Sequence, residues 1–553
     1  MTSSRQGPAR AACVGAVAAA LVTLPGLWVG TLWDNSETAY GEVAREILLT
    51  HDWVVMHLNS VPYFVQPPLY FWLGAVFSFL LGPTAFALRL PSALATIVLS
   101  GFTGYAVARQ LGTRVGIYAA VILSTCLMQA VIGRLAIMDA LLDLAVAMSI
   151  FWWFRGLETG RDRYVIYGWI AAAGGFLAKG LVAPVVAALV IVPFYFWNRR
   201  CETMQPPSAR AWFWGAAAFL AIVAPWPAAL VAHYHFFPLQ KLIGEYTVGR
   251  YTSVVENQSG PIWYYVPVII LGFFPWIAFL PMAVVDGLRN LRLAGGADPL
   301  QRVLRLAFAW VVMPLLFFSL ARTKLPNYVA LAFPALAVLT ALYFEGVVRK
   351  GGTRAAAISA ATVPVTIGAL AFAIWLFTRN NKLTAEVAGV LPGLLGMGLA
   401  IFAGSLLTAL LVARPKSVRI APYALALAAT IAADVLATIV APHAETYKPV
   451  PRLAAIIERE RRPGDEVAIQ NVSGGNALLF YTHPVVRVLA EPGSTDPQND
   501  GVDPRAFICG VRRAWVVAPA ARPDYDPTYG RHRQVVAIDQ KAALLLYDGP
   551  PCR

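Results

Sequence analysis

The stretch DNSETAYGEVAREILLTHDWVVMHLNSVPYFVQPPLYFW, residues 34–72, sets the interpretation of the whole chain. It directly follows a long apolar segment, yet it carries Asp34, Glu37 and Glu42 among several tyrosine and tryptophan residues. It ends in two consecutive prolines and a short apolar run. Charged side chains next to membrane segments are costly and are usually retained for a site. We therefore expect this acidic, aromatic loop to belong to a functional site.

The composition around this loop is that of a polytopic membrane protein. Of the 553 residues, 58% are hydrophobic and 13% are charged, whereas soluble domains carry about 25% charged residues. The net charge of +14 is large enough for nucleic-acid binding. However, Arg and Lys stand in short clusters between apolar segments, which is how topology signals are distributed. We therefore favour a membrane protein over a nucleic-acid-binding protein.

Apolar runs of a length that crosses a membrane, roughly 20 residues, recur through most of the chain. We predict 13 spans, near residues 11–33, 86–108, 115–132, 138–154, 164–179, 181–198, 211–232, 261–285, 306–320, 326–347, 355–378, 387–413 and 420–441. The two spans within 164–198 are short. The run 69–81 is also short and follows the prolines, so it fits either a span or a helix on the membrane surface.

The basic clusters decide between these two alternatives for residues 69–81. If this segment lies on the membrane, all the inner loops carry the clusters, as the positive-inside rule requires. The clusters are Arg109 with Arg114, 155–163, Arg199-Arg200, 289–305, 349–354 and 414–419. If the segment crosses, most of them face outward. We therefore predict a multi-pass membrane protein with a cytoplasmic N-terminus and an outer C-terminus, which in a bacterium would lie in the inner membrane.

This topology gathers polar residues from distant parts of the sequence on the outer face. They are the 34–72 loop, Arg134 with Asp139, Lys179, the 233–260 loop, and Arg322 with Lys324. The convergence predicts an active site at the outer face of the membrane. We assign residues 1–442 to the transmembrane domain, with outer loops 34–85 and 233–260.

The composition changes near residue 443. We predict strands at 466–472, 477–482, 485–490, 513–519, 533–538 and 542–547, and a helix over 450–460. These elements predict an α/β domain over 443–553, which is large enough to fold alone and lies in the periplasm. Cys509 and Cys552 both fall there. An oxidising compartment permits a disulfide between them, and two unpaired cysteines are an equal alternative.

The outer face offers the groups that glycosyl transfer needs, namely a carboxylate base and cations for a phosphate leaving group. The sequence contains no Gly-rich nucleotide loop, so a phosphate-linked sugar would arrive on a lipid. Structural alternatives remain for each group. Arg134 and Asp139 could pair at a helix start, Glu42 with Arg45 and Glu46 fits a helix-surface pair, and Arg322 and Lys324 could snorkel. Lys179-Gly180 could mark a helix break.

Several motifs resemble those of polyprenyl-phosphate-dependent glycosyltransferases of the GT-C superfamily, in the branch of lipid A aminoarabinose transferases and protein O-mannosyltransferases. They are SETAYGEVAREI (36–47), FVQPPLYFWL (64–73), RLPSALA (89–95), GRLAIMDALLD (133–143), LAKG (177–180), EYTVGRY (245–251), GPIWYYVP, GFFPW and ARTKLPNYVALAFPALAVL (321–339). The resemblance covers the membrane region in order and implies an inverting transfer of a sugar from undecaprenyl phosphate.

The chain departs from the family pattern at the first two motifs. The family usually has an Asp immediately before the Glu that corresponds to Glu37, where this chain has Ser36. The aminoarabinose transferases usually read Phe-Glu-Lys-Pro-Pro, where this chain has Val65-Gln66 before the prolines. The outer-loop His after the Arg is replaced near Gln258. The resemblance therefore implies the reaction class and not the aminoarabinose donor.

The resemblance also implies roles for individual residues. Asp34 or Glu37 would act as base or orient the acceptor, with Asp139 in support. The substrate-binding candidates are Tyr63, Gln66, Arg134, Lys179, Arg250, Arg322, Lys324 and Tyr328. No cofactor is assigned, and a divalent metal at the acidic face stays open. Lipid A or another envelope glycan or lipid is the expected acceptor. The alternatives are transfer to secreted proteins, a transporter of a lipid-linked substrate, and an inactive scaffold.

Overall fold

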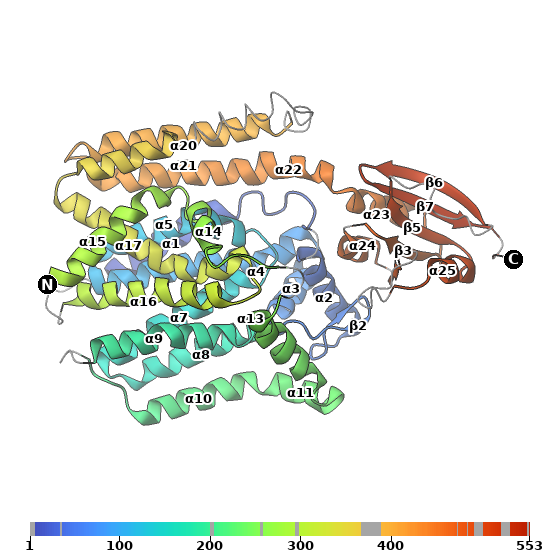
Figure 1. Ribbon diagram of the computed structural model, residues 1–553, viewed down its shortest axis with the longest axis horizontal. Helices are drawn as coiled ribbons and strands as arrows, with labels where there is room; N and C mark the ends of the chain where they lie inside the picture. The colour runs from blue at the N-terminus through green and yellow to red at the C-terminus, as the bar shows by residue number, and fades with distance from the viewer. Residues whose placement is uncertain are drawn as a thin grey trace. The chain divides into compact units, whose positions relative to one another are not determined.

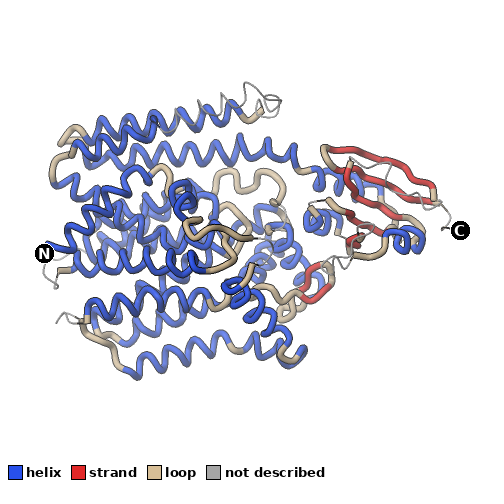
Figure 2. The backbone as a smooth tube through the Cα atoms, viewed as in Figure 1, coloured by secondary structure: helices blue, strands red, loops and turns tan. Residues whose placement is uncertain are grey.

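The computed structural model describes residues 6–33, 36–199, 204–254, 258–293, 298–365, 389–472, 474–483, 485–490, 501–520, 531–549 and 552. Its described residues are mostly helical, and their strands form one short hairpin and one sheet late in the chain (Figure 1, Figure 2). The chain divides into two compact units. Unit 1 comprises Met1–Leu27, Phe64–Tyr70 and Arg89–Val440, and unit 2 comprises Trp28–Tyr63, Phe71–Leu88 and Ala441–Arg553.

Unit 1 is a helical bundle with a large apolar core. Its elements, including the last part of α4, are α1 (Gln6–Thr23), α4 (Ala85–Leu111), α5 (Thr113–Thr125), α6 (Leu127–Ile132), α7 (Asp139–Thr159), α8 (Asp162–Lys179), α9 (Val182–Asn198), α10 (Ala209–Val223), α11 (Pro225–Tyr234), α12 (Phe237–Leu239), η1 (Gln240–Gly249), α13 (Arg250–Thr252), α14 (Tyr265–Gly272), η2 (Trp276–Phe279), α15 (Leu280–Leu293), α16 (Pro299–Leu320), η3 (Pro326–Ala332), α17 (Phe333–Arg349), α20 (Leu391–Val412), η4 (Val418–Ile420), α21 (Ala421–Val435) and η5 (Leu436–Val440).

Several of these helices can cross a membrane. Among the described residues, six are long and apolar enough to span it, and the number is eight if each of two bent pairs counts as one span. The pairs are α10 with α11, bent by 45°, and α14 with the segment Trp276–Leu291, bent by 109°. Prolines stand at both bends, where they remove a backbone donor and disfavour a continuous helix. The predicted span 355–378 lies partly outside the described residues.

The first predicted span is shorter than expected. We predicted a span over 11–33, but α1 ends at Thr23. The sequence Leu24-Pro25-Gly26 follows, and Gly26 adopts a φ of +74°. Proline cannot donate to the helix and glycine favours the left-handed region, so this triplet ends the helix although the residues beyond it stay apolar. Residues 24–33 are therefore turn and loop.

Close helix packing in unit 1 depends on glycine. Figure 1 shows α8 between α7 and α10. A Cβ at Gly168 would lie 2.3 Å from Cδ1 of Trp153 on α7, and a Cβ at Gly215 of α10 would lie 2.2 Å from Cδ1 of Trp169 on α8. Real Cβ contacts are never so short, so each indole occupies the space that a missing side chain leaves. This packing sets how closely α7, α8 and α10 approach one another.

Unit 2 contains a five-stranded mixed sheet of order β4-β3-β5-β7-β6. Its strands are β3 (Glu466–Gln470), β4 (Val486–Leu489), β5 (Ala514–Pro519), β6 (His532–Asp539) and β7 (Ala542–Asp548). The first three strands in spatial order are parallel, and β7 and β6 are antiparallel to their neighbours. Successive side chains point to opposite faces. Helices α23 (Pro449–Glu460) and α24 (Gly475–Thr482) pack on one face, and α25 (Pro504–Gly510) packs on the other.

One predicted strand is wrong. The segment 477–482 is not a strand but part of helix α24. The reason is topological, because β3 and β4 pair in parallel and parallel neighbours need a crossover connection, usually a helix. Its apolar run ALLFYT fits a buried helix as well as a buried strand, and length alone did not separate the two. The other strands and the helix over 450–460 are confirmed within two residues.

The first part of the opening loop belongs to unit 2. This part contains α2 (Glu37–Thr50) and a hairpin of β1 (His57–Leu58) and β2 (Val61–Pro62). Most of α3 (Leu69–Leu81) also belongs to unit 2. The side-chain amide of Asn59 donates to the carbonyl of Val486 at 2.8 Å and accepts from its N–H at 3.0 Å. Cys509 and Cys552 form a disulfide, which settles the alternative left open by the sequence.

Candidate active site

The centre of the candidate site in unit 1 is an ion pair between Lys179 and Asp139. Lys179 Nζ lies 2.5 Å from Asp139 Oδ1, and both side chains are largely buried. Asp139 begins α7 and Lys179 ends α8. A carboxylate at a helix N-terminus and an ammonium at a C-terminus are each favoured by the helix dipole. Gly180 then turns the chain with a φ of +69°. The predicted helix break is therefore present, and Lys179 is the last helical residue before it.

Tyr328 and Arg250 complete this cluster. Lys179 Nζ lies 5.4 Å from the centroid of the Tyr328 ring, which is a cation–π contact. Arg250 Nη1 donates to Tyr328 Oη at 3.3 Å. Two cations from different segments therefore meet at Tyr328, and one of them, Lys179, is paired with the carboxylate of Asp139. We call Asp139, Lys179, Arg250 and Tyr328 the cationic cluster.

Backbone pairing holds Arg250 beside Tyr328. The N–H of Thr323 donates to the carbonyl of Arg250 at 3.0 Å, and the N–H of Lys324 donates to the carbonyl of Gln258 at 2.9 Å. Ser259 and Thr323 form an antiparallel bridge. The loop that starts at residue 233 is thus joined to the ARTKLPNY segment by main-chain hydrogen bonds, which fixes the reach of the Arg250 side chain.

The QPP segment also lies near Lys179. A Cβ at Gly180 would lie 4.0 Å from Cγ of Pro67 and 3.9 Å from Oγ1 of Thr247. Gln66 is buried beside it in the chain. The ring of Phe64 contacts the ring of Tyr234 with centroids 5.2 Å apart. The structure therefore brings the second motif, the loop after α11 and the end of α8 together within unit 1.

Arg134 has a different partner from the one considered in the sequence. Its Nη2 lies 2.6 Å from Asp434 Oδ1 on α21, and it also donates to the carbonyl of Pro25 at 3.3 Å. Asp139 is paired with Lys179 instead. Arg134 thus links the loop before α7 to a late helix, and Asp434 is a polar residue that the sequence analysis missed. A lone Asp within an apolar helix is the signal that could have found it.

Lys324 and Arg322 differ in their surroundings. Lys324 Nζ donates to the carbonyls of Ser319 at 2.9 Å and Ala321 at 2.5 Å, at the end of α16, whose last carbonyls lack helical partners. Burial lowers the pKa of Lys324, and the nearby charge of Arg322 lowers it further. Arg322 itself is exposed. Lys324 therefore caps a helix, whereas Arg322 is accessible to a ligand.

Asp143 is a second carboxyl that the sequence analysis did not single out. It is buried one turn below Asp139 on α7, and Gln129 Nε2 donates to its Oδ2 at 3.0 Å. The spacing of four residues from Asp139 places both on one face of the helix. This i,i+4 relation was visible in GRLAIMDALLD, where the first Asp alone was assigned.

The acidic residues of the opening loop lie in unit 2. Asp34 lies outside the described residues. Glu37 is buried, and its Oε2 accepts from the N–H of Trp33 at 2.7 Å. The Trp33 ring lies under Lys448, with Nζ 3.8 Å from the ring centroid. Lys448, which the sequence analysis did not list as a candidate, is thus held next to Trp33.

The remaining carboxylates of α2 form hydrogen bonds with neighbouring residues of unit 2. Arg45 donates to both carboxylate oxygens of Glu42, at 2.8 and 2.5 Å, as the helix-pair alternative predicted. Glu46 accepts from the N–H of Ser60 at 3.1 Å. The ring of partly buried Tyr63 contacts Phe71 edge to face, with centroids 5.9 Å apart.

Among the described residues, no group of three or more His, Cys, Asp and Glu side chains could hold a metal ion.

The cationic cluster has the chemistry of a phosphate-binding site. Lysine and arginine form charge-assisted hydrogen bonds with phosphate oxygens, and a tyrosine hydroxyl adds a neutral donor. Asp139 balances part of the charge and can accept a proton or a hydroxyl hydrogen bond. The site sits at the ends of apolar helices, so its phosphate would belong to a molecule within the membrane.

The chain is similar in sequence to several known proteins. Residues 65–228 match the family model of dolichyl-phosphate-mannose-protein mannosyltransferases. The undecaprenyl phosphate-α-4-amino-4-deoxy-L-arabinose arabinosyl transferase of Edwardsiella ictaluri is 29% identical over 407 residues, covering 70% of this chain and 69% of that protein. The protein of that name from Aeromonas salmonicida is 32% identical over 384 residues, covering 68% and 67%. In another relative of that name, from Pectobacterium carotovorum, this chain covers 57% of the length.

Solved structures agree in fold. ArnT from Cupriavidus metallidurans bound to undecaprenyl phosphate superimposes with a TM-score of 0.79 at 21% identity, covering 97% of each chain. An oligosaccharyltransferase from Archaeoglobus fulgidus, tethered to an acceptor peptide, gives a TM-score of 0.51 at 12% identity, covering 93% of this chain and 69% of that one. At these identities the similarity establishes the fold.

The helical bundle and its cationic cluster thus define a multi-pass membrane protein with a GT-C fold. The resemblance seen in the sequence motifs is confirmed by the sequence relatives. The chain belongs to the polyprenyl-phosphate-dependent glycosyltransferases, in the branch of the aminoarabinose transferases.

Proposed function

We propose that the protein transfers a sugar from undecaprenyl phosphate to lipid A or a related envelope glycolipid. The observation that carries the proposal is the cationic cluster, in which Asp139, Lys179, Arg250 and Tyr328 converge from distant segments of one unit. The names of the relatives supply the donor and the reaction, and the ArnT structure shows the same fold with undecaprenyl phosphate bound.

The proposed mechanism is a single displacement that inverts the anomeric carbon. The acceptor hydroxyl attacks that carbon, its proton passes to a carboxylate, and the bond to undecaprenyl phosphate breaks. Lys179 and Arg250 stabilise the negative charge that grows on the phosphate, which is the largest electrostatic demand of the step. Tyr328 donates to the same phosphate and holds Arg250 in place. Arg322 is exposed and supplies a further cation.

We assign the carboxylates the catalytic roles that the sequence motifs implied. Asp34 or Glu37 would accept the proton or orient the acceptor, and Asp139 would support the reaction by fixing Lys179. Gln66 and Tyr63 would line the donor pocket. We assign Lys324 a positioning role, because its ammonium is bound by backbone carbonyls at the end of α16. Arg134 would position the start of α7 through Asp434.

The proposed topology places this chemistry on the periplasmic face. It has 13 spans, a cytoplasmic N-terminus, the 69–81 segment on the membrane surface, and residues 443–553 as a periplasmic α/β domain after a transmembrane domain over 1–442. The positive-inside distribution of Arg and Lys supports it. The disulfide between Cys509 and Cys552 supports the oxidising side for the last domain.

The test uses membranes that contain single variants and a labelled undecaprenyl-phosphate sugar. Lys179→Met should lower sugar transfer by about 10²-fold, as the loss of a transition-state donor does, and Asp139→Asn should also lower it because Lys179 loses the carboxylate that holds it. Lys350→Met, at an exposed lysine after α17, is the matched control and should keep full activity. Full activity in both site variants would overturn the assignment. Transfer to a secreted protein instead of lipid A would redirect the acceptor.

A further inference from the structure

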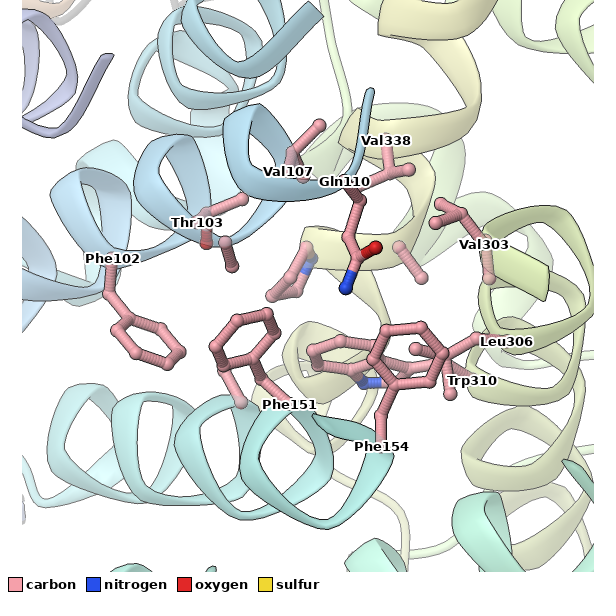
Figure 3. Close-up of a pocket in the computed structure, with 15 residues that line it drawn as sticks. Phe102, Thr103, Val107, Gln110, Phe151, Phe154, Val303, Leu306, Trp310 and Val338 are labelled. Carbon is pink, nitrogen blue, oxygen red and sulfur yellow. The ribbon is translucent and has the colours of Figure 1, made fainter. Parts of the chain in front are cut away.

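An apolar cavity of about 60 Å³ lies inside unit 1 between α4, α7, α16 and α17 (Figure 3). Its lining is mainly aromatic and aliphatic, and it includes Phe102, Phe151, Phe154 and Trp310. Ala147, the lining residue of α7 closest in sequence to Asp139, is eight residues from it, or about 12 Å along the helix. The cavity is therefore separate from the cationic cluster.

Three of the four helices around the cavity, α4, α7 and α16, meet at one polar end of it. Gln110 of α4 points into the cavity (Figure 3), and Phe154 of α7 and Val303 of α16 line the same end. These positions lie near the end of α4, near the end of α7 and at the start of α16. Each is therefore close to the loops that carry the arginine clusters, which the positive-inside rule assigns to the cytoplasm.

A charged network closes this end. Gln110 Nε2 donates to Glu158 Oε2 at 2.9 Å. Arg302, which precedes the lining residue Val303, pairs with Glu158 Oε1 at 3.0 Å. Arg155, which follows the lining residue Phe154, pairs with the same carboxylate. One glutamate therefore joins the cavity to two guanidinium groups.

A third arginine adds to the positive charge. Arg155 and Arg163 lie over the ring of Tyr164, with Cζ 5.9 and 5.1 Å from its centroid. We call Arg155, Arg163 and Arg302 the arginine cluster. Two of its members, Arg155 and Arg302, pair with the same carboxylate, Glu158, so these three groups together carry a positive charge that can attract an anion.

We propose that the cavity and the arginine cluster form a binding site for an anionic glycerophospholipid. Its phosphate would lie beside Arg155 and Arg302, and a short part of one acyl chain, a few methylene groups long, would enter the cavity past Gln110. An apolar cavity has too few polar partners to hold water well, whereas methylene groups replace the missing contacts. Arginine binds phosphate through charge-assisted hydrogen bonds. Basic pockets between transmembrane helices on the cytoplasmic side bind anionic headgroups.

The experiment uses the purified full-length protein in a neutral detergent. Phosphatidylglycerol and phosphatidylcholine with identical acyl chains are added separately, and bound lipid is counted by native mass spectrometry. We expect the wild type to retain phosphatidylglycerol preferentially. Arg302→Gln should weaken that preference by about tenfold, corresponding to about 1.4 kcal/mol. Arg109→Gln removes an exposed arginine of the same helix end, which lies on Tyr105, and should leave the preference unchanged.

Two cavity-filling variants test the acyl-chain part of the site. Ala307→Leu and Ala335→Leu each place a larger side chain into the cavity from different helices. Each should lower binding of phosphatidylglycerol, whereas Ala221→Leu on an exposed face of α10 should not. The melting temperature without lipid identifies any variant that fails to fold, and Arg302→Gln then carries the test.

Three results would overturn the proposal. The first is equal retention of phosphatidylglycerol and phosphatidylcholine by the wild type. The second is unchanged preference in Arg302→Gln or in both folded cavity variants. The third is displacement of bound phosphatidylglycerol by equimolar undecaprenyl phosphate, which would assign the cavity to the donor's tail. The readout is lipid retention, so failure of sugar transfer would not affect it.

Discussion

Tyr328 connects the two cations of the candidate site. It accepts from Arg250 and carries Lys179 over its ring. Tyr328→Phe keeps the ring and removes the hydroxyl, so Lys179 keeps its ring contact while Arg250 loses its hydrogen bond to the Tyr328 hydroxyl. We expect transfer to fall by about tenfold or more, the effect of one hydrogen bond to a charged group, with a higher KM for the lipid donor.

Tyr447→Phe, the same change at an exposed tyrosine of unit 2, serves as the control. The measurement is the initial rate of transfer against donor concentration in proteoliposomes. An unchanged KM and rate in Tyr328→Phe would show that the hydroxyl contributes nothing to the donor site.

Glu42 provides a test by pH. Burial raises the pKa of its carboxyl, although the hydrogen bonds from Arg45 oppose this. A carboxyl that binds its proton more tightly in the folded state stabilises the fold below its unfolded pKa. That contribution is lost as the pH rises through the folded value. Glu42→Gln removes the titration, so its melting temperature relative to the wild type should increase from acid to neutral pH.

The comparison is made by scanning fluorimetry over that pH range. Glu460→Gln, at an exposed position of α23, gives the reference for a change of charge at the surface. A difference between Glu42→Gln and the wild type that stays constant or falls with rising pH would contradict the assigned direction.

Among the elements, the break between α8 and α9 controls the position of Lys179. Gly180 has φ +69° and ψ −150°, a conformation that side chains with a Cβ avoid. Gly180→Ala should therefore cost about 1–3 kcal/mol of strain and displace Lys179, so we expect both the melting temperature and the transfer rate to fall.

Gly174 supplies the matched control within the same helix. A Cβ there meets nothing within 4 Å, and alanine favours a helix interior over glycine by roughly 0.5–1 kcal/mol. Gly174→Ala should keep activity and raise the melting temperature slightly. Equal behaviour of the two variants would show that the Gly180 turn has no special role.

The sequence predicted an element correctly where the hydrophobic period and the length of the apolar run indicated the same kind of element. The bounds of 69–81 match α3, and the two short spans within 164–198 match α8 and α9, because Gly180 marks the break between them. It failed at 477–482, where strand and helix patterns coincide and the parallel pairing of β3 with β4 decided for a helix. It also placed the end of the first span too late, since Leu24-Pro25-Gly26 outweighs the apolar run that follows.

The site was predictable as a set of residue types and less so as a set of partners. Lys179, Asp139, Arg250 and Tyr328 were all named, and the structure brings them together. The pairing of acids with bases was not predictable. Arg134 pairs with Asp434, about 300 residues away in the sequence, and Lys179 pairs with Asp139. Such long-range pairs depend on helix packing, which local patterns do not specify.

At the scale of the whole molecule, the disulfide joins α25 to the C-terminus of unit 2. It closes a loop of 43 residues, for which chain entropy predicts a stabilisation of about 4 kcal/mol. Cys509→Ser should therefore lower the melting temperature of the full-length protein under oxidising conditions. Cys13→Ser, which removes an exposed free cysteine, should not. Equal melting of the wild type with and without reductant would contradict the contribution of this bond.

The direct assay of sugar transfer decides whether this molecule is the enzyme that its cationic cluster indicates. Purified protein in proteoliposomes is incubated with labelled undecaprenyl-phosphate aminoarabinose and lipid A, and the products are separated by mass. We predict lipid A that carries one added sugar, together with free undecaprenyl phosphate, and about 10²-fold less of both products with Lys179→Met. Movement of the intact labelled donor across the bilayer without any sugar transfer would contradict a glycosyltransferase and indicate a transporter.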